Sequence, residues 1–154
     1  MILQARSEYR VKYANYVRNI KNAIPKIFGQ TRVGEIPGNR LTTEDIMSWK
    51  SSTGVKWARD HLWSMVDEDG DDQHDTYMSR IVNEVFKPER CTTNNCAFTV
   101  AIIDLIFDTK VHTTTLTGEM IADRMNKLSD KEVFKLIFLL AHNFMILIFT
   151  FKIK

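Results

Sequence analysis

The chain has 154 residues, of which 44% are hydrophobic and 26% are charged, as in an ordinary globular domain that is long enough to bury a core. We therefore expect a single domain over residues 1–154. The formal net charge is +2, but residues 67–89 hold 8 acidic residues against 2 basic ones. The basic residues form no run and are not interleaved with aromatic residues, which argues against a nucleic-acid partner. Two cysteines, Cys91 and Cys96, are too few for a disulfide scaffold.

Apolar residues recur at helical spacing through the first half of the chain. The first such series predicts an amphipathic helix that ends near Pro25, and the glycines and proline of residues 29–40 predict a loop after it. Thr42 begins a second predicted helix, which residues 51–54 interrupt. The first series is Tyr9, Tyr13, Val17, Ile20 and Ile24, and the apolar face after the interruption is Val55, Ala58, Leu62, Met65 and Val66.

The acidic segment 67–72 raises the question of calcium. An EF-hand loop that began at Asp67 would need Gly at its sixth position and Glu at its twelfth, where the chain has Asp72 and Met78. We expect a solvated loop here, and no metal or other cofactor. The sequence also lacks a Gly-rich phosphate loop, a nucleophile elbow and a His-x-x-x-His pair, so we predict no catalytic residue and no enzyme.

Residues 96–107 are the most apolar stretch before the C-terminal region, interrupted only by Thr99 and Asp104. A helix that is apolar nearly all round must be buried on most sides. A buried strand is the alternative, but the length of the stretch and the helical pattern of residues 77–86 before it favour a helix. A buried Asp104 would need a partner, so we expect it either to be paired or to face a groove or an interface.

After a Thr-rich turn, residues 116–128 predict a further helix. Ser129 and Glu132 form a capping box that opens the apolar segment Leu136–Phe151. This segment is shorter than the roughly 20 apolar residues that a membrane-spanning helix needs. We expect a packed C-terminal helix, with a membrane anchor as the alternative. The N-terminal residues do not have the pattern of a signal peptide.

The helix that ends in Val85-Phe86, the short turn before Asn94 and the apolar helix that follows form one motif. This motif resembles the first homology motif of the Bcl-2 family of apoptosis regulators, although Asn95, Cys96 and Ala97 replace the Trp, Gly and Arg of that family. Residues 62–67 are similar to the family's third helix. Residues 47–54 stand in place of the third homology motif without its Gly-Asp pair, and the second homology motif is not recognisable. Such erosion is typical of viral members.

The resemblance implies an all-α, Bcl-2-like bundle in which amphipathic helices wrap a central hydrophobic helix. It further implies an inhibitor of apoptosis that holds the death-motif (BH3-type) helix of a host pro-apoptotic protein in a groove, in the host cytoplasm or at the mitochondrial outer membrane. Because Ala97 replaces the arginine that pairs with the ligand's Asp, we expect few partners. The alternatives are a homodimer or an immune modulator that binds signalling adaptors. The implied groove residues are Leu62, Met65, Val66, Tyr77, Ile81, Val82, Val85, Asn94, Ala97, Val100 and Ala101.

Overall fold

A computed structural model describes residues 2–38, 40–66, 75–87, 90–128, 133, 135–137 and 140. Within these ranges every regular element is a helix, and the one isolated antiparallel bridge joins Met65 to Thr76. The predicted all-α class is therefore confirmed. Among the described helices, none has both the length and the apolar character needed to cross a membrane. The acidic segment 67–72 and the capping box at residues 129–132 lie outside the described residues.

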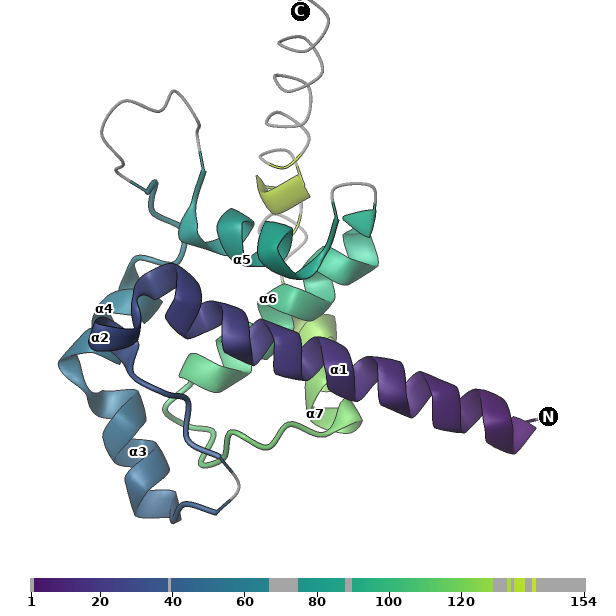
Figure 1. Cartoon of the computed structure of the whole chain (residues 1–154), viewed down its shortest axis with the longest axis horizontal. Helices are drawn as coiled ribbons and strands as arrows, with labels where there is room; N and C mark the ends of the chain where they lie inside the picture. The colour runs from purple at the N-terminus through teal and green to yellow at the C-terminus, as the bar shows by residue number, and fades with distance from the viewer. Residues whose placement is uncertain are drawn as a thin grey trace, which may run out of the picture.

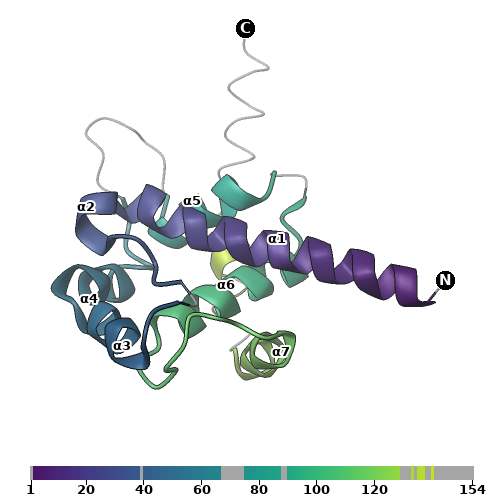
Figure 2. The same ribbon diagram turned by 60° about the horizontal axis from the view of Figure 1, so that its bottom comes forward.

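The centre of the fold is α6 (Thr93–Phe107), which confirms a helix rather than a strand for the apolar stretch. The side chain of Thr92 caps its first turn by accepting a hydrogen bond from the backbone N–H of Asn95 at 3.2 Å. Its isoleucines, Ile102, Ile103 and Ile106, are fully buried. The helix contacts α1, α4, α5 and α7, and Figures 1 and 2 show these helices arranged around it.

The first helix, α1 (Ile2–Phe28), packs mainly against α5 (Tyr77–Val85). The helix was predicted to end near Pro25, and it continues past the proline to Phe28. The proline removes one backbone hydrogen bond close to the end of the helix, where the loss costs little cooperativity. The last turn is held by packing, since the Phe28 ring stacks on Tyr77 with 4.8 Å between ring centroids. The N-terminal turns of α1 project beyond the other helices in both views (Figures 1 and 2).

The segment predicted as a loop over residues 29–40 contains the short helix α2 (Gln30–Val33). Gly29 precedes it with a φ of 94°, a conformation that glycine adopts without strain. Val33 is buried, and its carbonyl accepts a hydrogen bond from the indole N–H of Trp49 at 2.7 Å. These tertiary contacts, which the local sequence does not reveal, explain why a turn of helix forms here.

The predicted interruption between two helices is confirmed, since α3 (Thr43–Ser51) and α4 (Thr53–Asp60) meet at Ser52. Gly54 allows α4 to approach α2 closely. A Cβ atom at this position would lie 1.7 Å from the carbonyl oxygen of Arg32. The apolar face was predicted to extend to Met65 and Val66. This prediction is wrong, because α4 ends at Asp60.

The remaining described elements complete the bundle. Thr42 begins α3 as predicted, and its side chain and that of Asp45 form a reciprocal capping box. The predicted helix after the Thr-rich turn is α7 (Gly118–Lys127), which Thr117 caps. The start of the C-terminal apolar segment packs on the bundle, since Leu136 and Leu140 are buried. Most of the rest of Leu136–Phe151 lies outside the described residues.

Candidate partner-binding surface

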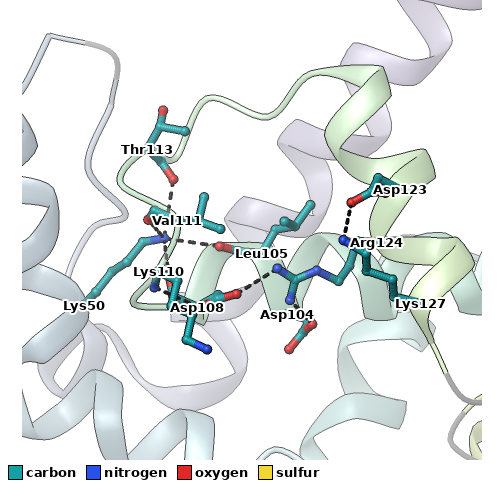
Figure 3. Close-up of polar contacts among 10 residues, drawn as sticks. All are labelled: Lys50, Asp104, Leu105, Asp108, Lys110, Val111, Thr113, Asp123, Arg124 and Lys127. Carbon is teal, nitrogen blue, oxygen red and sulfur yellow. Dashed lines mark hydrogen bonds and ion pairs between the residues drawn. The ribbon is translucent and has the colours of Figure 1, made fainter.

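Charged side chains from α6 and α7 meet near the C-terminal end of α6 (Figure 3). Arg124 donates hydrogen bonds to the carboxylates of Asp104 and Asp108, the latter at 2.7 Å. Burial disfavours the Asp108 carboxylate, but the hydrogen bonds from Arg124 and from the Lys110 backbone N–H hold its pKa below the usual value. The Asp108 hydrogen bond in turn raises the pKa of Arg124, which therefore stays charged.

Asp104 has a charged partner, as expected from the sequence, but its side chain is not buried. Its side chain is 50% exposed, because it lies on the face of α6 that borders α7 and solvent. By contrast, Thr99, the other polar interruption of the apolar stretch, is fully buried and donates its hydroxyl to the Asn95 carbonyl at 2.9 Å. The two polar residues thus have different roles. The Thr99 hydroxyl has its hydrogen-bond partner within the helix, whereas the Asp104 carboxylate is accessible at the surface.

A fully buried lysine, Lys50 of α3, reaches the same end of α6 from the inside (Figure 3). Its ammonium group donates to the carbonyl oxygens of Val111 at 2.6 Å and Asp108 at 2.9 Å, with longer contacts to Leu105 at 3.2 Å and Thr113 at 3.4 Å. Burial lowers the pKa of Lys50 to about 8, against the opposing effect of the Asp108 charge. Through these hydrogen bonds Lys50 links α3 to the end of α6 and to the loop that follows it.

A cavity of about 270 Å³ lies beside the Arg124–Asp104 ion pair, and we name it the α6–α7 cavity. Its walls combine apolar side chains with the charged groups described above. Two groove residues implied by the resemblance, Leu62 and Val100, meet here, and both are largely buried, at 8% and 4% exposed. The full lining is Leu62, Trp63, Val100, Asp104, Arg124, Lys127 and Leu128.

The other implied groove residues are distributed over several parts of the fold. Ile81, Val82 and Ala101 are fully buried and belong to the core. Tyr77 packs against Phe28 and Trp57, on the side of α1 and α4. Val66, Val85 and Ala97 are half-buried, whereas Met65 is 44% exposed.

Asn94 is exposed at the start of α6 and lines a second cavity, of about 460 Å³, between α1, α6 and α7. Three aromatic rings line this cavity, and two of them, Tyr13 and Phe98, meet edge to face with 5.4 Å between ring centroids. The structure therefore brings Leu62 and Val100 together in one cavity and places Asn94 at another.

Four residues of the α6–α7 cavity were not implied by the sequence: Trp63, Arg124, Lys127 and Leu128. Asp104 and Asp108 are like charges four residues apart at the end of α6, a spacing that is unfavourable without a nearby cation and could have indicated one. The identity of that cation depends on how α7 packs against α6, which the local pattern does not specify.

Cysteine and metal chemistry find little support in the described residues. Burial raises the pKa of the Cys96 thiol to about 11, with a smaller contribution from Cys91, so its nucleophilic thiolate is scarce at neutral pH. Within the part of the chain that the structure describes, no three His, Cys, Asp or Glu side chains are grouped so that they could bind a metal ion.

Comparison with family models, curated proteins and solved structures found no match.

Proposed function

We propose that the protein inhibits apoptosis by binding the death-motif helix of a pro-apoptotic Bcl-2 protein at the α6–α7 cavity. The observation that carries this proposal is the meeting of Leu62 and Val100 in an open cavity, next to a central helix that is otherwise packed into the core. A cavity that apolar side chains line in part, beside a buried helix, can take one anchor residue of an amphipathic ligand helix. The resemblance of residues 77–107 to the first homology motif of the Bcl-2 family suggests that this ligand helix is a death motif.

The surface of α6 supports a ligand that lies along it. Ala97, Val100 and Asp104 follow at helical spacing, so they lie on one face. Ala97 is half-buried and small, which leaves room for the backbone of a ligand helix to approach. The apolar anchor of the ligand would enter the cavity at Val100, and the preceding turn would pass over Ala97.

A second candidate function is an immune modulator that acts through dimerisation or through a signalling adaptor, without binding a death motif. Ile81, Val82 and Ala101 favour this candidate, because their complete burial leaves them no surface for a ligand between α5 and α6. Ligand binding through those three residues would require α5 to move away from α6. The α6–α7 cavity, by contrast, is already present in the structure.

Titration of the protein with a panel of synthetic death-motif peptides by calorimetry tests the proposal. We expect one or a few peptides to bind, and Leu128→Glu to abolish binding, because it places a charge at the half-buried rim of the cavity. Leu41→Glu is the matched control, since Leu41 is 49% exposed and does not line the cavity.

Failure of every peptide to bind the folded wild-type protein would refute the proposal. In that case sedimentation velocity would test the second candidate through the presence of a dimer. Binding that survives Leu128→Glu unchanged would place the ligand elsewhere on the protein.

A further inference from the structure

The charged rim of the α6–α7 cavity is more acidic than its lining residues suggest. Arg124 is 22% exposed and already binds two carboxylates, those of Asp104 and Asp108. Lys127 forms an ion pair with Asp123 at 2.8 Å on the outer side of α7. The cations of the rim are therefore engaged by carboxylates of the protein itself.

Of the two carboxylates on Arg124, Asp104 is the more accessible. Asp108 is 21% exposed and does not line the cavity. On its inner side it faces the buried Lys50. Asp104 is 50% exposed and lines the cavity. Asp108 has Lys50 as a second cation beside Arg124, so the feature that sets Asp104 apart is its carboxylate, which is open both to solvent and to the cavity.

We propose that the partner helix is recognised through a lysine or arginine side chain that pairs with Asp104 while a neighbouring apolar residue enters the cavity beside Val100. This inference rests on the proposed function and specifies the chemistry of its ligand. A basic side chain gains an ion pair with Asp104 without disturbing the protein. An acidic side chain at the same place meets the Asp104 charge and must displace a carboxylate from Arg124.

The position of Asp104 defines where the basic residue lies on the ligand. Asp104 is one turn beyond Val100 on the same face of α6, so the paired residue is about one helical turn from the apolar anchor. The family's ion pair joins an arginine of the receptor to an aspartate of the ligand. With Ala97 at that arginine position, the polarity of the contact proposed here is reversed.

The test uses the tightest-binding peptide of the panel and derivatives in which each Lys or Arg is replaced, one at a time, by Gln. Dissociation constants are measured for wild type, Asp104→Asn and Asp104→Glu. Glu84→Gln is the matched control, because Glu84 is also a surface carboxylate in an ion pair, with Lys26, and it does not line the cavity. Thermal melting confirms that each variant is folded.

We expect Asp104→Asn to weaken binding of the parent peptide by about 3–10-fold, in the range of a half-exposed ion pair. One Gln derivative should lose the same factor against wild type and nothing further against Asp104→Asn. Asp104→Glu should retain most of the affinity, and Glu84→Gln should not change it.

Equal effects of Asp104→Asn on the parent peptide and on every Gln derivative would overturn this inference and leave the proposed function intact. Tighter binding by Asp104→Asn would also overturn it, because an acidic side chain of the ligand would then be binding to Arg124. If no peptide binds the folded wild-type protein, both the proposed function and this inference fail.

Discussion

The substitution Lys50→Met tests whether the buried ammonium group stabilises the fold. Methionine fills most of the volume of lysine but donates no hydrogen bond. The two shorter contacts of the Lys50 ammonium group, at 2.6 and 2.9 Å, are hydrogen bonds from a charged donor and are worth about 1.5–3 kcal/mol each. The contacts at 3.2 and 3.4 Å add little. The desolvation that lowers the Lys50 pKa offsets part of this gain, so we expect Lys50→Met to lower the free energy of unfolding by about 1–3 kcal/mol at pH 7.

The same lysine predicts a pH dependence. In the unfolded chain the Lys50 pKa has its ordinary value of 10.5, whereas burial lowers it to about 8 in the folded protein. Between these two pH values the unfolded state binds more protons. The free energy of unfolding therefore rises with pH through this window, by up to about 1.4 kcal/mol per pH unit. Below pH 8 both states carry the charge, and this contribution is constant.

Urea denaturation followed by circular dichroism, at pH values from 7 to 10, measures both effects. The stability difference between wild type and Lys50→Met should widen above pH 8, since the variant lacks this titration. Lys56→Met is the control: Lys56 is exposed on α4, and its loss should change stability by less than about 0.5 kcal/mol. Equal stability of Lys50→Met and wild type at pH 7 would refute the role of the carbonyl contacts. Parallel pH profiles would refute the lowered pKa.

Three further substitutions test the packing and the ligand surface. Gly54→Ala should lower the melting temperature by several degrees, because its methyl group would collide with the Arg32 carbonyl; Gly38→Ala, with no atom within 4 Å of the new Cβ, should not. Ile102→Ala should cost about 2–5 kcal/mol in urea denaturation, and an unchanged midpoint would contradict its place in the core. Ala97→Arg should broaden the set of death-motif peptides bound in calorimetry. Tight binding of the whole panel by wild type, without any gain in the variant, would show that the missing arginine does not limit selectivity.

The elements that could be predicted from the sequence are those whose signals are local. Thr42 and Asp45 form their capping box within one turn, so the start of α3 could be predicted. The interruption at residues 51–54 was also predictable, from its Ser, Thr and Gly content. The identity of α6 as a buried helix followed from an apolar surface that covers all sides of the helix. Such a helix must be buried on most sides, and the helical patterns around it supplied the elements that cover it.

Features that depend on distant parts of the chain could not be predicted. Lys50 has the sequence context of a solvated lysine, and its burial depends on carbonyl groups of residues 105–113. Gly54 marked an interruption, but its close approach to Arg32 depends on the packing of α2. The apolar rows on α5 were assigned to a ligand groove, yet periodicity cannot distinguish a face that binds a ligand from one that packs on the core. In the structure, Ile81 and Val82 are fully buried and pack in the core.

The packing of α1 on α5 has a consequence for the order in which the chain can fold. The buried face of α1, with Ile20, Ile24 and Phe28, contacts a helix that begins only at Tyr77. During synthesis this apolar face lacks its main partner until the segment of α5 has been made, although α2 and Trp57 of α4 contact it earlier in the chain. Nascent chains that stop before Tyr77 would expose the face of α1 and would need a chaperone or another chain to cover it.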